Sequence, residues 1–194
     1  MLRHILGSIV VLSSPLSAYS LHKLLHITKQ RINQVLKDLH AILDIPKADA
    51  LPLRLHHPSF RDFLLNNQRC KDPSFWVNEK QAHQALAERC MQLMSTSLKQ
   101  DVCGMNAPGM LVADAERSRI EQALPPEVQY SCRYWIDHVQ KSLIRPRDND
   151  QIHVFLREHF LHWLEALGWI QRVSEVIRAI ASLESITAVS YLLV

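Results

Sequence analysis

Apolar residues recur at helical spacing along almost the whole chain of 194 residues. Repeats at i, i+3, i+4 and i+7 place apolar side chains on one face of a helix, so this pattern predicts helices instead of a large sheet. Glycine is scarce, with only 4 residues, which leaves few positions for the tight turns that a chain of many strands requires. The sequence therefore predicts a mainly α fold.

The N-terminal part contains three predicted helices. The first covers about 2–12, the second lies around 21–25, and the third begins after a cap at Thr28. The apolar stripe of the third helix runs through Ile32, Val35, Leu36, Leu39, Ile42 and Leu43. Their short connections indicate that the three helices pack together.

After the third helix, the spacing of the apolar residues changes from helical to alternating. From Leu43 to His56 the apolar residues alternate on either side of turn-forming residues, which predicts a β-hairpin. A short helix is then expected over 59–65, with Ser59 as its N-cap and an acidic residue, Asp62, at the third helical position. Three helices and one small β-hairpin predict a winged helix over residues 1–78.

Only helices are expected in the remaining region, 79–194, where short links between long helices favour antiparallel stacking that could extend into a superhelix. A loop contains Gly104, Pro108 and Gly109, and one helix is expected to end at Gly168. The residues expected to point inward are Cys132, Trp135, Ile136, Val139 and Leu143, then Leu156, Phe160, Trp163, Leu164 and Leu167, then Ile170, Val173, Ile177 and Ile180. The apolar end, 186–194, has no polar tail, so we expect this region to be truncated.

The composition is that of a globular chain without a strong charge. Hydrophobic residues make up 47% of the sequence and the formal net charge is +3, so no electrostatic field demands nucleic acid as a partner. Four cysteines occur without a C-x-x-C pair, and neither a zinc site nor a disulfide framework is predicted. We expect Cys90 and Cys132 to pack as small hydrophobic residues, and the chain to be cytoplasmic, in a reducing compartment.

The two ends of the chain raise the question of a membrane. Arg3 precedes the apolar run 5–12, and small residues follow at 17–20, so a secretory signal is an alternative to a core helix. The helical spacing of the apolar residues favours the core helix. Near the other end, Arg178 and Glu184 interrupt the one stretch long enough to span a bilayer, so no membrane helix is expected.

No familiar catalytic motif is present. The sequence lacks G-x-x-x-x-G-K-[ST], G-x-G-x-x-G, G-x-S-x-G and H-E-x-x-H, so we expect no catalytic residues and no enzyme activity of its own. Histidine is abundant, with 11 residues, and the pairs His22/His26 and His159/His162 could each share a helical face. Because no third ligand is indicated beside either pair, we expect no metal site.

DNA binding is an alternative function. The third predicted helix exposes Lys29, Arg31 and Lys37, which are residue types that contact phosphates and base edges. Three acidic residues dilute this positive patch: Asp38, Asp44 and Asp49. With so slight a net charge, nucleic acid is the disfavoured partner. A helical protein-interaction scaffold over 79–194 is a second alternative.

One segment resembles a known family. The order His-x-Ser-Phe-x-acidic-Phe occurs here as His57, Ser59, Phe60, Asp62 and Phe63. It resembles the end of the winged helix in NACHT-type STAND ATPases, the fungal relatives of NOD-like receptors and of heterokaryon-incompatibility proteins. This resemblance implies that His57 senses nucleotide by contacting the phosphates of ADP held by a NACHT domain.

The resemblance extends to three further segments, 2–10, 130–139 and 155–167. It implies a non-catalytic regulatory fragment of a signal-transduction ATPase of the innate-immunity type, because the phosphate-binding loop of the family is missing from this sequence. ATP or ADP would then be a cofactor of full-length family members, and none is expected in this chain. The implied partners are a NACHT domain in cis, together with protein partners or self-oligomerisation.

Overall fold

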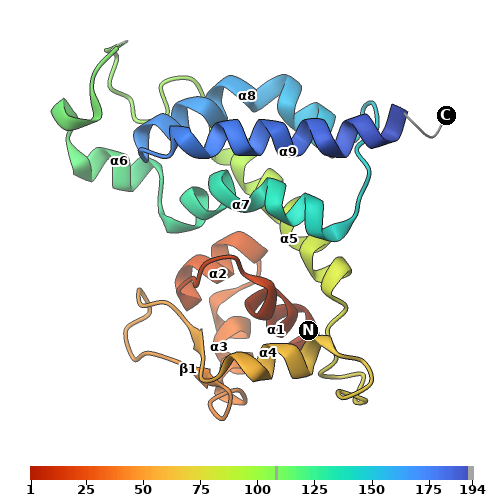
Figure 1. The fold of residues 1–194 in the computed structure, drawn as a ribbon. Helices are drawn as coiled ribbons and strands as arrows, with labels where there is room; N and C mark the ends of the chain where they lie inside the picture. Colours follow the sequence, from red (N-terminus) through yellow and green to blue (C-terminus); the bar gives the residue numbers. More distant parts are fainter. Residues whose placement is uncertain (108, 192–194) are drawn as a thin grey trace. The chain divides into compact units, whose positions relative to one another are not determined.

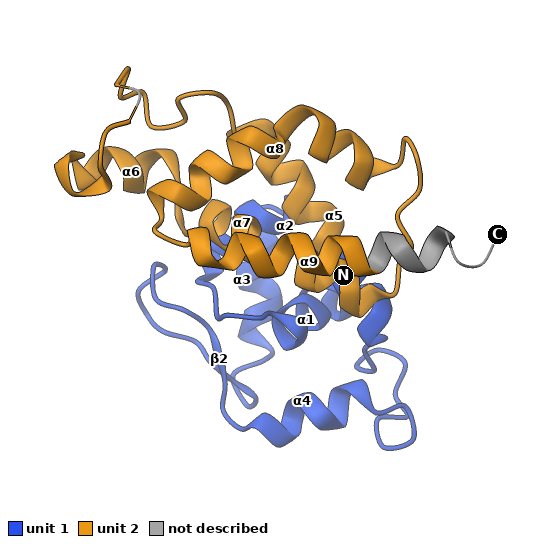
Figure 2. Ribbon diagram, turned by 45° about the horizontal axis from the view of Figure 1, so that its top comes forward, with its two compact units in different colours: residues 1–86 blue, residues 87–194 orange. Residues whose placement is uncertain are grey.

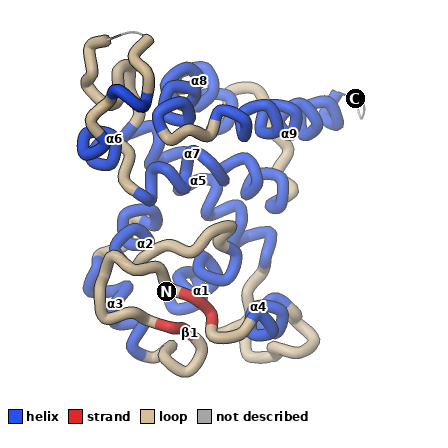
Figure 3. The backbone as a smooth tube through the Cα atoms, turned by 60° about the vertical axis from the view of Figure 1, so that its left-hand side comes forward, coloured by secondary structure: helices blue, strands red, loops and turns tan. Residues whose placement is uncertain are grey.

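The computed structural model describes residues 1–107 and 109–191, with side chains described for 1–107 and 109–185. The described chain is mainly helical with one small two-stranded hairpin, which confirms the predicted fold class (Figure 3). It divides into two compact units, 1–86 and 87–194 (Figure 2). The division falls inside a helix, and the domain boundary at residue 78 stays a prediction.

The three predicted helices of the first unit are present (Figure 1). They are α1 (Leu2–Val11), α2 (Ala18–Leu25) and α3 (Lys29–Lys37). The Ser17 hydroxyl caps α2 by accepting a hydrogen bond of 3.0 Å from the backbone N–H of Ser20. The centre of this unit is formed by side chains at most 1% exposed: Ile5, Leu6, Leu21, Leu24, Leu25, Ile32, Leu43 and Leu64.

The predicted hairpin is shorter than the alternating pattern suggested. Strands β1 (Leu43–Asp44) and β2 (Arg54–Leu55) pair antiparallel, with Leu43 opposite Leu55. Leu51, which the pattern placed in the second strand, lies in the connecting loop and is 54% exposed. The loop therefore leaves the sheet early, and alternation holds only for the residues nearest the pair.

An extended segment between α1 and α2 runs beside the hairpin loop, which the sequence did not predict. Ser17 and Pro52 form an isolated antiparallel bridge. The backbone N–H of Leu53 donates to the Leu16 carbonyl at 2.9 Å. These contacts hold the loop against the helices of the first unit.

Helix α4 (Pro58–Leu65) closes the first unit. Leu64 is fully buried, and its carbonyl accepts a hydrogen bond of 2.9 Å from the Val77 N–H. Phe60 and Phe63 are only half-buried, and their ring centroids lie 5.9 Å apart. The C-terminal turn of α4 is therefore one anchor of the helix.

The remaining elements are helical, as predicted. They are α5 (Glu79–Ser97), the 3₁₀ turn η1 (Val112–Asp114), α6 (Arg117–Ala123), α7 (Pro126–Ser142), α8 (Gln151–Trp169) and α9 (Val173–Tyr191). Helices α7, α8 and α9 each pack against the other two (Figure 1). Helix α6 had no sequence signal, and Pro108 of the predicted loop lies outside the described residues.

Two tryptophans anchor the second unit, as expected. Trp135 and Trp163 are at most 1% exposed, with ring centroids 5.8 Å apart in an edge-to-face arrangement. The Trp163 indole N–H donates to the Cys132 carbonyl at 2.8 Å. Cys90 and Cys132 are buried free thiols, which confirms their prediction as small hydrophobic residues.

Three expectations for the helix ends and faces were wrong. Leu143 is 63% exposed, because it terminates α7 in the left-handed region at φ 60° instead of continuing its inner face. Gly168 lies inside α8, and the left-handed turn comes at Gln171, with φ 56°. Val173 and Ile177, expected inward, are 58% and 75% exposed.

Val173 and Ile177 are exposed because a different face of α9 packs inward. Its inward face carries Glu175, paired with Arg133 of α7, and the buried Leu183. The side chains of the apolar end, 186–194, lie outside the described residues. Within the described part of the chain, no helix combines the length and the apolar character needed to cross a bilayer.

Candidate functional site

His57 is the N-cap of α4. Its backbone is extended, with φ −143° and ψ 137°, and its Nδ1 atom accepts a hydrogen bond of 3.1 Å from the backbone N–H of Ser59. Ser59 was predicted to be the cap, and that prediction was wrong. Pro58 occupies the first helical position, where its fixed φ and missing N–H are tolerated, so the helix begins before Ser59. Asp62 is consequently too far along α4 to complete a capping box.

The cap fixes the tautomer of the His57 ring. Nδ1 accepts from the Ser59 N–H, and the Ser59 hydroxyl lies 2.7 Å from the same nitrogen. In the neutral ring the hydrogen must therefore reside on Nε2. His57 is exposed, and among the described residues Nε2 has no protein partner. The site thus presents one N–H donor beside the start of a helix.

The neighbouring histidine is oriented differently. His56 Nε2 lies 3.2 Å from the carbonyl oxygen of His40, so this ring lies against the end of the α3 region. Helix α4 itself is held by Arg61, whose Nε donates to the Val10 carbonyl at 3.0 Å and whose Nη2 contacts Glu79 at 3.2 Å. His57 therefore stands on a helix that is tied to both α1 and α5.

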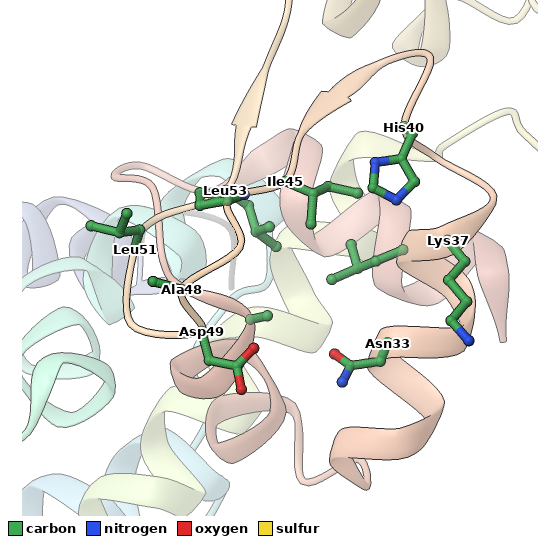
Figure 4. Close-up of a pocket in the computed structure, with 11 residues that line it drawn as sticks. Asn33, Lys37, His40, Ile45, Ala48, Asp49, Leu51 and Leu53 are labelled. Atoms are coloured by element: carbon green, nitrogen blue, oxygen red, sulfur yellow. The ribbon is translucent and has the colours of Figure 1, made fainter.

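The three candidate nucleic-acid contacts do not form a uniform basic surface. Lys29 forms an ion pair with Asp49 of the hairpin loop. Arg31 is exposed on α3, whereas Lys37 lines a pocket between α3 and that loop (Figure 4). One of the three cations is neutralised by a carboxylate, which weakens the case for a phosphate-binding face.

Only one of the two predicted histidine pairs shares a helical face. His26 lies beyond the end of α2 in the left-handed region, so it does not share a helical face with His22. His159 and His162 do meet on α8, with 3.4 Å between their Nδ1 atoms. Across the residues that the structure describes, no three His, Cys, Asp or Glu side chains gather closely enough to hold a metal ion.

The second unit has a cleft of about 640 Å³ beside the C-terminal end of α8, larger than the pocket of about 220 Å³ that Lys37 lines. Two carboxylates line it, and both are already engaged by backbone groups. Glu165 accepts from the N–H groups of Asp101 and Val102 at 3.1 Å each, and Asp101 accepts from the N–H of Met105 at 2.8 Å. These bonds hold the loop around residues 101–105 against α8. Because both carboxylates already bind backbone N–H groups, whereas Nε2 of His57 has no partner among the described residues, His57 is the better candidate for function.

Sequence comparison relates the chain to a fungal protein. It is 32% identical over 149 residues to the vegetative incompatibility protein HET-E-1 of Podospora anserina, in an alignment that covers 67% of this chain. The match supports the resemblance to fungal heterokaryon-incompatibility proteins. The chain spans 11% of the length of HET-E-1. No family model matches the chain, and no solved structure matches it.

Proposed function

We propose that this chain is a regulatory region of a NACHT-type signalling ATPase, in which a winged helix reads the nucleotide state and the following helices relay it to sensor or effector domains. The similarity to HET-E-1 supports the family. The winged-helix interpretation is supported by α1, α2 and α3 followed by the hairpin, and by the extended segment that bridges the hairpin loop.

The observation that carries the proposal is the cap formed by His57. Because Nδ1 is occupied by Ser59, the Nε2–H group is the free end of the ring and can donate to a phosphate oxygen. A hydrogen bond to an ionised oxygen is shorter and stronger than a neutral one. The N-terminus of α4 adds a favourable field for an anion at the same place.

The contact would act as a switch between two states. His57 would touch the phosphates of ADP only in the closed arrangement with the nucleotide-binding domain, so its loss would favour the open arrangement. A hydrogen bond to a charged group contributes about 1.5–3 kcal/mol. Losing it would therefore shift the closed-to-open ratio by roughly ten- to a hundredfold.

The catalytic chemistry would belong to another segment. The sequence has no phosphate-binding loop, so the isolated chain should neither retain ATP nor hydrolyse it. A NACHT domain in cis would be the first partner, and other proteins or further copies of the chain would be the downstream ones. A purified-chain ATPase assay that showed turnover above a blank would contradict this part of the proposal.

The decisive experiment places the chain in the context of its relative. The segment of HET-E-1 that aligns with this chain is replaced by the chain itself, and the purified chimaera is assayed for bound ADP by chromatography after denaturation. We expect His57→Ala to lower the ADP retained per molecule and to strengthen the incompatibility response in cells.

Two further variants make the result specific. His57→Asn keeps a good N-cap but lacks the reach of an imidazole, so it should lose ADP as His57→Ala does. His56→Ala is the matched control, because this adjacent ring contacts the His40 carbonyl instead of capping α4. Equal ADP retention in all variants, or equal loss in His56→Ala, would reject the role of His57.

A further inference from the structure

Two polar groups of Ser59 meet at one atom of His57. The backbone N–H of Ser59 donates to Nδ1 at 3.1 Å, and the Ser59 hydroxyl oxygen lies 2.7 Å from the same nitrogen. A backbone N–H can only donate, so Nδ1 carries no hydrogen in the neutral ring. At 2.7 Å from a bare nitrogen, the hydroxyl must donate as well, and it is the closer of the two donors.

The hydroxyl matters because His57 is exposed, and packing contributes little to the orientation of its ring. The ring is held at Nδ1 by the backbone N–H and by the hydroxyl. Without the hydroxyl, the longer bond of 3.1 Å would remain alone. The ring could then turn away from the helix more often.

The neighbouring His56 shows the difference that Ser59 makes. Its Nε2 atom lies 3.2 Å from the His40 carbonyl oxygen, which can only accept, so this N–H is already used within the protein. The Nε2–H of His57 meets no acceptor in the part of the chain that the structure describes. Of two adjacent histidines, the one beside Ser59 is therefore the one that presents a free donor.

The tautomer of His57 restricts the kind of ligand that the ring can bind. A metal ion binds the bare nitrogen of a neutral imidazole. The bare nitrogen here is Nδ1, which Ser59 occupies, so coordination through Nε2 would move the hydrogen to Nδ1 and set it against the Ser59 N–H. An oxyanion accepts from Nε2–H without this change. The pair formed by His57 and Ser59 thus favours an oxyanion over a metal ion.

We propose that the Ser59 hydroxyl is a positioning group, which keeps the hydrogen of His57 on Nε2 and directs that N–H towards an oxyanion. This role rests on the proposed function for the identity of the oxyanion, a phosphate of ADP. Without the hydroxyl, the ring adopts the Nδ1–H tautomer more often, and that tautomer cannot donate from Nε2. One neutral hydrogen bond changes an equilibrium by about two- to tenfold, which is the expected loss in affinity for ADP.

The first measurement uses the full chain without nucleotide. With ¹⁵N-labelled histidine, nuclear magnetic resonance distinguishes bare from protonated ring nitrogens, at about pH 8 where neutral imidazole prevails. We expect His57 to be in the Nε2–H form in the native chain and to become a mixture of tautomers in Ser59→Ala. Ser59→Thr restores a hydroxyl and should restore the Nε2–H form. His56 should keep its tautomer in all three chains.

The second measurement is ADP retention in the HET-E-1 chimaera. Ser59→Ala keeps the backbone N–H and therefore the cap, yet it should lower the affinity for ADP about two- to tenfold. Ser59→Thr should retain as much ADP as the native residue. Ser74→Ala is the matched control, because Ser74 is an exposed serine whose backbone N–H is held by Oδ1 of Asp72 at 2.8 Å instead of by a histidine. This control should retain ADP fully.

Three results would overturn the positioning role of Ser59. The first is an unchanged tautomer of His57 in Ser59→Ala. The second is full ADP retention in Ser59→Ala under conditions where His57→Ala loses it. The third is a loss in Ser59→Thr as large as that in Ser59→Ala. If His57→Ala itself retains ADP, the nucleotide-sensing function fails, and the tautomer measurement still decides whether the Ser59 hydroxyl sets the ring.

Discussion

The imidazole Nδ1 of His57 and the backbone N–H of Ser59 form a hydrogen bond of 3.1 Å that begins helix α4. The same bond directs the free Nε2–H of His57 away from the helix. One side chain thus has two roles, a structural one through Nδ1 and a proposed ligand-binding one through Nε2. Substitutions that keep the cap distinguish these roles.

We first predict the stability effects at this cap. His57→Ala removes the acceptor for the Ser59 N–H and should lower the free energy of unfolding by about 0.5–2 kcal/mol. His57→Asn restores an acceptor and should stay within about 0.5 kcal/mol of the native chain. Urea denaturation followed by circular dichroism measures both. If the two variants are equally unstable, the cap is not the reason for the effect.

A second prediction concerns the ion pair that joins α7 to α9. Arg133 donates to both carboxylate oxygens of Glu175 at 3.0 Å, and this hydrogen bonding holds the pKa of Arg133 above its usual range. Both side chains are largely shielded from water, at 26% and 20% exposure. Glu175→Ala leaves the guanidinium without its partner and should lower the free energy of unfolding by about 1–3 kcal/mol.

An exposed pair provides the matched control. On α8, Nη2 of Arg157 lies 3.3 Å from Oε1 of Glu158, but the two side chains are 60% and 53% exposed. Glu158→Ala should change the free energy of unfolding by less than about 1 kcal/mol, because water screens such a pair. Thermal unfolding of the two variants side by side decides the matter, and a loss at Glu158 as large as that at Glu175 would contradict the argument.

The helices with long apolar stripes could be predicted from the sequence, but the short helix α6 and the buried face of α9 could not. Val173, Ile177 and Ile180 form one apolar stripe, and Val176, Ile180 and Leu183 form another. A helix that is apolar on more than one face does not reveal which face is buried. The contact between Arg133 and Glu175, 42 residues apart, lies on the buried face of α9, and no local pattern contains it.

The residues that begin and end the helices were also predicted only approximately from the sequence. Ser59 is a better N-cap by residue type, yet His57 is used because Pro58 favours the first helical position. Gly168 resembles a helix end, but α8 continues past it to Trp169. The importance of His57 was predicted from a family resemblance, whereas the pocket beside Lys37 depends on a loop conformation that the alternating pattern misplaced.

A third prediction addresses DNA binding. Lys29 is paired with Asp49 and the net charge of the chain is only +3, so the surface of α3 is a poor phosphate-binding face. At 0.15 M salt, fluorescence anisotropy with a 20-base-pair duplex should show no binding tighter than the roughly 10⁻⁴–10⁻⁶ M of non-specific contacts. Tight, salt-sensitive binding that is lost in Lys29→Ala or Arg31→Ala would show the opposite.

The last prediction follows from the two buried thiols of the second unit. Burial raises the pKa of the Cys90 thiol to about 12 and that of the Cys132 thiol to about 12, from the ordinary value of 9.0 for cysteine. Below pH 9 both thiols are neutral in the folded and the unfolded chain, so their contribution to the free energy of unfolding is fully present there. Between pH 9 and 12 only the unfolded chain ionises, and stability falls by about 1.4 kcal/mol per pH unit for each thiol.

Cysteine substitution isolates this effect from other groups that titrate at high pH. Cys90→Ala removes one of the two thiols, so the fall in the free energy of unfolding between pH 9 and 10.5 should be less steep by about 1.4 kcal/mol per pH unit. Cys132→Ala should give a similar change. Urea denaturation at several pH values provides the slopes. Identical slopes in the native chain and both variants would mean that the thiols ionise as readily in the folded chain as in the unfolded one.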